Sequence, residues 1–83
     1  MTISVRLFAR ARDLAGCDML RLDMPAKATV AELRRRVAAA RPELRDFLSR
    51  CAIAVGEDFA ADEAIVPDDS EVAIIPPVSG GQS

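Results

Sequence analysis

The chain has 83 residues, which is enough for one small domain with a single compact core. Eleven basic against thirteen acidic residues give a net charge of −2, so the charge balance argues against a nucleic-acid partner. The sequence contains no histidine, which excludes a Ser-His-Asp triad, a histidine general base and a histidine-ligated metal. No apolar run approaches the ~20 residues that span a bilayer, and the N-terminus lacks a signal-peptide pattern. We therefore expect a cytoplasmic protein without a membrane or metal partner.

The two cysteines, Cys17 and Cys51, do not have the spacing of a metal-binding or redox pair. In a cytosolic chain we expect both thiols to be reduced and partly buried. A redox pair or a thiol that carries a persulfide remains the alternative.

The first third of the chain predicts two antiparallel strands. Residues 2–8 alternate apolar and polar side chains, which is typical of a strand with one buried face. Residues 9–15 suit a short helical turn that ends at Gly16. Residues 19–24 alternate again, so we expect a hairpin whose loop contains the helical turn.

The middle third predicts the main helix. Thr29 and Glu32 have capping-box spacing, in which the Thr29 hydroxyl accepts from the Glu32 amide and the Glu32 carboxylate reaches back. Apolar residues then recur at helical spacing until Pro42 ends or interrupts the helix. The arginines at 34–36 resemble a phosphate-binding cluster, but a solvated helix face explains them better. Residues 43–50 predict a second short helical segment.

The last third predicts further strands. Residues 52–55 form a short apolar run that ends at Gly56, and residues 71–75 form a final strand. Between them we expect an acidic, irregular stretch over 57–64, a brief strand at 65–66 and a turn over 67–70. The predicted class is α+β: a mixed sheet of about four to five strands packed on one main helix. The predicted domain covers residues 1–75.

Residues 76–83 predict an extended C-terminal tail. Pro76 and Pro77 have fixed φ angles and no amide donor, so they end the sheet and direct the chain outward. At ~3.1–3.5 Å per residue, the stretch from Pro76 to Gly81 can reach roughly 20 Å. Gly80 and Gly81 have no Cβ, so the tip is thin enough to enter a narrow channel on another protein. A plain frayed end is the alternative.

Five segments of the chain share the pattern of a known family, and together they cover nearly the whole chain. The segments are Val5–Ala9, Arg12–Gly16, Thr29–Arg34, Ala54–Val55 and Glu71–Gly81. They resemble the ThiS/MoaD family of sulfur carriers, and within it the small subunits of molybdopterin synthase. The run that ends in Pro-Pro-Val-Ser-Gly-Gly is the most specific part of this resemblance, which implies the ubiquitin-like β-grasp fold.

The resemblance implies sulfur carriage without catalysis by the chain itself. An adenylating enzyme (MoeB-like) would use ATP to activate the terminal carboxylate, and a persulfide donor would then convert it to a thiocarboxylate on Gly81. The large synthase subunit (MoaE-like) would accept the tail and pass the sulfur to cyclic pyranopterin monophosphate, within a heterotetramer. No cofactor is expected on this chain. The tail that inserts would comprise Pro76, Pro77, Val78, Ser79 and Gly80, and the partner contacts would be Phe8, Phe59 and Ile75.

Gln82 and Ser83 depart from the family pattern, in which the second glycine carries the reactive carboxylate. The carboxylate of Ser83 lies ~7 Å beyond Gly81, so an adenylating site built for a glycine terminus does not fit it. Either these two residues are removed before activation, as in ubiquitin-like precursors, or the chain is not a working carrier in this form.

Three alternatives share the predicted fold. The chain resembles carriers that supply sulfur to thiazole formation or tRNA thiolation, which would bind another acceptor and no large synthase subunit. It also resembles ubiquitin-like protein modifiers, which are often made as precursors. The last alternative is an interaction domain with an inert tail.

Overall fold

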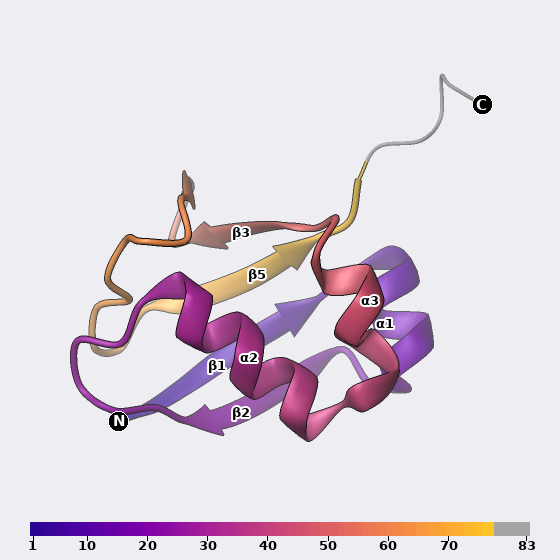
Figure 1. Cartoon of the computed structure of the whole chain (residues 1–83), viewed down its shortest axis with the longest axis horizontal. Helices are drawn as coiled ribbons and strands as arrows, with labels where there is room; N and C mark the ends of the chain where they lie inside the picture. The colour runs from indigo at the N-terminus through magenta and orange to yellow at the C-terminus, as the bar shows by residue number, and fades with distance from the viewer. Residues whose placement is uncertain (78–83) are drawn as a thin grey trace.

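The computed structural model describes residues 1–77. Five strands form one mixed sheet, with the strand order β2-β1-β5-β3-β4, and helices cover one of its faces (Figure 1). The predicted α+β class, with one main helix on a mixed sheet, is therefore confirmed. The elements are β1 (Thr2–Leu7), α1 (Ala9–Ala15), β2 (Met19–Asp23), α2 (Val30–Ala40), η1 (Pro42–Leu44), α3 (Arg45–Leu48), β3 (Ala52–Val55), β4 (Asp58–Ala60) and β5 (Glu71–Ile75).

The first and last strands lie side by side in the centre of the sheet. β1 pairs with β2 in the antiparallel sense, as the predicted hairpin requires, and with β5 in the parallel sense. β5 in turn pairs with β3 in the antiparallel sense. Only β5 therefore joins the β1–β2 half of the sheet to the β3–β4 half.

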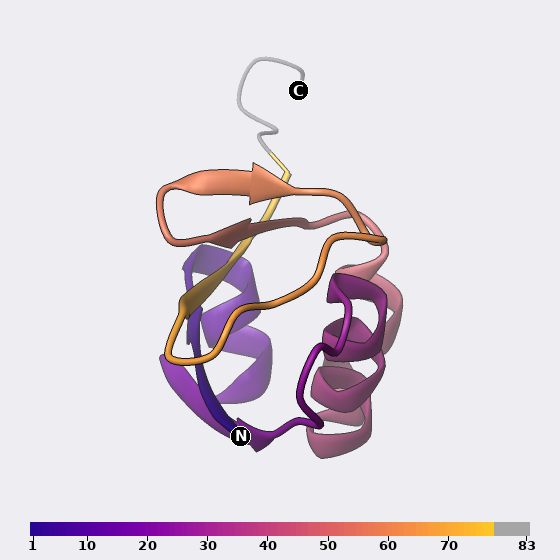
Figure 2. The same cartoon turned by 90° about the vertical axis from the view of Figure 1, so that its left-hand side faces the viewer.

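Strand alternation directs one set of side chains against α2. Ile3 and Val5 of β1 and Ile74 of β5 are 0% exposed, and Leu33 and Val37 of α2 meet them in the core. Figure 2 shows α2 on one side of the sheet and no helix against the other side, within the part of the chain that is described. We call the side away from α2 the outer face.

The end of α1 and the start of α2 lie near their predicted positions, because local sequence signals determine both. Gly16 ends α1 with a φ of 76°, in the left-handed region that glycine adopts without strain. At the start of α2, the Thr29 hydroxyl accepts from the Glu32 amide at 3.3 Å, as predicted. The Glu32 carboxylate does not follow the capping-box prediction, because it pairs with two arginines, Arg35 and Arg36.

The predicted helical segment over 43–50 is present in a shorter form. Pro42 starts a 3₁₀ turn, η1, which continues into the four-residue helix α3. Leu44 and Leu48 are buried and Phe47 is half-buried, so the inward side chains are those expected from the spacing.

Two predictions for the stretch between β3 and β5 are wrong. Residues 58–60 are not irregular but form β4, which pairs with β3 across a turn at Gly56, where φ is 65°. The sequence gives no clear sign of this strand, because Asp58 and Ala60 have low β propensity. The strand forms because it pairs with β3. Residues 65–66 form no strand: Ile65 makes a single isolated bridge to Thr29, and Val66 is buried.

Candidate functional site

The tail begins at the centre of the sheet. β5 ends at Ile75, and half-buried Pro76 and exposed Pro77 follow it (Figure 1). Because proline has no amide donor, the ladder between β5 and its two neighbours ends there. A tail that starts between two paired strands has a fixed origin on the body. The other predicted tail residues, Val78, Ser79, Gly80 and Gly81, and the two that follow them lie outside the described residues.

One row of side chains crosses four strands on the outer face. Arg6 of β1 is opposite Ala73 of β5, Ala73 is opposite Ala54 of β3, and Ala54 is opposite Phe59 of β4. The side chains of the two alanines are short, so the surface is shallow between Arg6 and Phe59. Phe59 stands at its end on the edge strand, with 74% of its surface exposed.

A second apolar group lies at the tail end of the same face. The backbone of Phe8 is extended and follows Leu7, the register partner of Ile74, so alternation places Phe8 beside Ile75. Ile75 is in turn opposite Ala52 of β3. Phe8 is 41% exposed and Ile75 is half-buried. The three predicted contact residues therefore share the outer face, two of them at the root of the tail.

Charged side chains also lie on the outer face. The Arg6 guanidinium pairs with the Glu71 carboxylate at 3.3 Å, and both side chains are exposed. Residues 51–77 contain seven carboxylates and no Lys or Arg, so the edge that presents Phe59 is acidic. A protein that receives Phe59 would therefore meet negative charge around an apolar side chain.

Sequence reasoning did not identify Ala54 and Ala73 as parts of the outer face. The signal was present in the alternation of 52–55 and 71–75, but their adjacency depends on the β3–β5 register. That register is a long-range property, which local patterns do not specify.

The two cysteines lie apart from the outer face and form no disulfide. Cys51 is buried, its thiol lies 3.4 Å from the Phe47 carbonyl oxygen, and burial raises its pKa. A buried thiol with a raised pKa is a poor nucleophile. Cys17 is half-exposed and lies 3.9 Å from the Arg41 guanidinium.

The arginines at 34–36 divide into two kinds. Arg35 and Arg36 lie on an exposed face and bind Glu32 at 2.5 and 2.7 Å, which supports the solvated-face interpretation. These hydrogen bonds, that of Arg35 first, hold the pKa of Glu32 below its ordinary value. Arg34 differs, because it donates to Asp62 at 2.9 Å and to the Leu48 carbonyl oxygen at 2.5 Å. It thus ties α2 to α3 and to the loop after β4.

Neither a metal centre nor a membrane span is found in the described part of the chain. Within residues 1–77, no three His, Cys, Asp or Glu side chains are grouped closely enough to hold a metal ion. None of the helices in that range has the length and apolar character needed to cross a bilayer.

Several solved structures match this fold. SAMP1 from Haloferax volcanii has a TM-score of 0.89 at 26% identity, over 98% of this chain and 100% of that one. Subunit 1 of the molybdopterin-converting factor from Helicobacter pylori, solved in complex with subunit 2, has a TM-score of 0.70 at 23% identity, over 98% and 100% of the two chains. These matches confirm the predicted β-grasp fold.

Comparison with known sequences identifies the family. The molybdopterin synthase sulfur carrier subunit of Arabidopsis thaliana is 42% identical over 79 residues, covering 95% of this chain and 82% of that protein. The corresponding subunit of Chlamydomonas reinhardtii is 34% identical, over 98% and 100% of the two chains. The family model for ThiS matches residues 5–81. The chain therefore belongs to the ThiS family.

Proposed function

We propose that the chain is the sulfur carrier subunit of molybdopterin synthase. The observation that carries this proposal is the similarity to the plant subunit along 95% of the chain. The geometry supports it, because the segment that contains Gly80 and Gly81 follows Pro76 and Pro77, which leave the sheet at its central strand.

The reacting group is the carboxyl carbon of Gly81. A carboxylate is a poor electrophile, so a MoeB-like partner first adenylates it with ATP and releases pyrophosphate. The terminal sulfur of a persulfide then attacks the acyl carbon and AMP leaves, which gives an acyl disulfide. A second thiol attacks the donor's sulfur in this disulfide, which leaves a thiocarboxylate on Gly81 and a disulfide on the donor. Gln82 and Ser83 occupy the position that the adenylate needs, so cleavage of the bond after Gly81 precedes activation.

The outer face is the docking surface for the large, MoaE-like subunit. Phe8 and Ile75 lie at the tail root, so a protein that covers them also receives the tail. Phe59 provides a second, more distant contact, which fixes the rotation of the carrier about the tail. The body positions the tail, the partner supplies the catalytic groups, and the reaction takes place in the cytoplasm. The chain itself binds no cofactor and catalyses nothing alone.

Intact mass spectrometry of the protein isolated from its own cells tests this proposal. A chain that ends at Gly81, with sulfur in place of one carboxyl oxygen, and that transfers this sulfur to cyclic pyranopterin monophosphate when mixed with the large subunit, is expected. A population that retains Gln82 and Ser83, with no trimmed or sulfur-bearing fraction, would contradict it.

A second function, as a ubiquitin-like protein modifier, is favoured by one observation. The 26%-identical Haloferax volcanii structure is that of SAMP1, a small archaeal modifier protein. In that case the Gly81 carboxyl carbon would form isopeptide bonds with lysine amines. Digestion of total cell protein followed by a search for branched peptides that carry the chain's tail distinguishes the two functions.

A further inference from the structure

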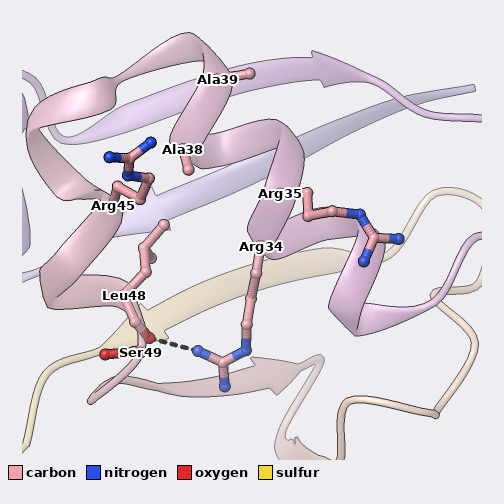
Figure 3. Close-up of a pocket in the computed structure, with 7 residues that line it drawn as sticks. All are labelled: Arg34, Arg35, Ala38, Ala39, Arg45, Leu48 and Ser49. Carbon is pink, nitrogen blue, oxygen red and sulfur yellow. Dashed lines mark hydrogen bonds between the residues drawn. The ribbon is translucent and has the colours of Figure 1, made fainter.

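A groove on the helix side of the molecule combines an apolar floor with a cationic rim. Its volume is about 510 Å³, within the range of roughly 300–1,000 Å³ that binding pockets occupy. Figure 3 shows the residues of α2 and α3 around it, with Leu48 drawn between Arg45 and Arg34. The floor consists of Ala38, Ala39 and Leu48, and the rim consists of Arg34, Arg35, Arg45 and Ser49.

The rim retains unused positive charge. Arg34 and Arg35 are each bound to a carboxylate of this chain, Asp62 and Glu32 respectively. The Arg45 side chain is exposed, and its guanidinium makes no hydrogen bond or ion pair with any residue in the range 1–77. A ligand for this groove must therefore bring an apolar group for the floor and a carboxylate for Arg45.

The chain divides its charge between two regions. Residues 30–50, which form the helical layer, contain six arginines and three carboxylates, whereas residues 51–77 contain seven carboxylates and no basic residue. The groove between α2 and α3 and the segment that contains Phe59 therefore carry opposite charge, so these two surfaces attract each other when two copies meet.

The acidic region presents an apolar side chain at its most exposed edge. Phe59 is 74% exposed on β4, the edge strand, and its neighbours Glu57 and Asp58 are exposed carboxylates. This edge offers the two components that the groove lacks: the aromatic ring of Phe59 for the apolar floor, and the exposed carboxylate of Glu57, two residues before it in the turn, for Arg45.

We propose that the β4 edge of one copy docks in the α2–α3 groove of a second copy, with Phe59 on the floor and Glu57 against Arg45. The contact is heterologous, because groove and edge are different surfaces. Every copy keeps one free groove and one free edge, so the association grows as an open chain of copies. The large subunit would compete with it, because both use Phe59.

Sedimentation of the full chain over a range from micromolar to millimolar concentration tests the proposal. At low salt, the weight-average mass should rise with concentration beyond that of two copies. At about 0.5 M NaCl, where the Debye length falls to a few ångströms, it should return toward that of one copy.

Two variants separate the two surfaces. Arg45→Glu removes the groove's free cation, and Phe59→Ala removes the side chain that fills it. In each variant alone, the apparent affinity of self-association should fall about tenfold or more, as expected for a central interface residue. An equimolar mixture retains one intact groove and one intact edge, so it should form pairs and stop there.

Arg21→Glu is the matched control. It makes the same charge change at an exposed arginine of β2, away from the groove, and should associate as the unmodified chain does. Circular dichroism of each variant verifies that it folds. Arg45→Glu should also transfer sulfur normally with the large subunit, so failure of this inference and failure of the proposed function are distinguishable.

Three outcomes would overturn the inference. A chain that stays a single copy at all concentrations at low salt has no such contact. A mass that levels off at two copies indicates a symmetric dimer through another surface. NMR resonances of Ala38 and Ala39 report on the groove. If they shift on addition of a poly-glutamate peptide, but not with the concentration of the chain, the groove binds a different acidic protein.

Discussion

The two faces of the sheet are built from the same strands but serve different purposes. On the face toward α2, Ile3, Val5 and Ile74 are fully buried and pack at core density. On the outer face, the residues between them are short or exposed, and Phe59 has no contact that would bury it. Neighbouring residues of one strand therefore differ in function: one specifies the fold, and the next is free to bind a partner.

The tail provides the sharpest test of this separation. A chain engineered to end at Gly81 should accept sulfur without trimming, whereas a chain that ends at Gly80 should lose sulfur transfer completely. Both should unfold at the same temperature, because the sheet ends at Ile75. Thermal unfolding and product formation with the large subunit measure the two properties, and a lower unfolding temperature for the shorter chain would contradict the separation.

Adjacent isoleucines in β5 compare the two faces directly. Ile74→Ala removes a side chain that is 0% exposed, so it should lower the free energy of unfolding by about 2–5 kcal/mol. Ile75→Ala, on the outer face, should lower it by less than about 1.5 kcal/mol, because the side chain is only half-buried. Denaturant unfolding measures both. Equal losses would mean that the outer face also forms part of the core.

Phe59 tests binding alone. Phe59→Asp should weaken association with the large subunit about tenfold or more, since it replaces an exposed aromatic anchor with a charge. Its stability should change by less than about 0.5 kcal/mol. Titration calorimetry gives the affinity. Ile65→Asp, at another exposed apolar position outside the strands, serves as the control and should bind normally.

The N-terminal cap of α2 tests what stabilises the helix that covers the inner face of the sheet. Thr29→Ala removes the oxygen that accepts from the Glu32 amide, and should cost about 1 kcal/mol of stability. Thr29→Ser should restore most of it. Thermal unfolding of the three chains measures this effect, and identical transitions would show that the cap contributes nothing.

The smallest expected effect depends on pH. Because Arg35 and Arg36 lower the pKa of Glu32 in the folded chain, this carboxylate stabilises the fold above its ordinary pKa of 4.5. The contribution is lost as the pH falls through the lowered value. In Glu32→Gln the free energy of unfolding should depend less on pH below about 4.5, which denaturant unfolding at a series of pH values measures. The same pH dependence in both chains would contradict this role of Glu32.

Helix boundaries could be predicted from the sequence, because single residues mark them. Gly16, Thr29 and Pro42 each mark a helix end in sequence and in structure. β4 was missed because its partner, β3, determines it. The placement of Phe8 beside Ile75 likewise depends on pairing between distant segments. The placement of Arg45 opposite α2 depends on how the turn η1 reverses the chain between the two helices. The outer face and the groove could therefore not be assembled from periodicity alone.

The central position of β5 has a consequence for synthesis. Until residues 71–75 have left the ribosome, the β1–β2 and β3–β4 halves have no strand to connect them. Formation of the sheet must therefore wait for almost the entire chain, in contrast to domains that fold from their N-terminus as they emerge. The reactive tail follows the strand that completes the body. An incomplete carrier therefore has no tail to offer, and a partner that binds the tail meets a body that can already fold.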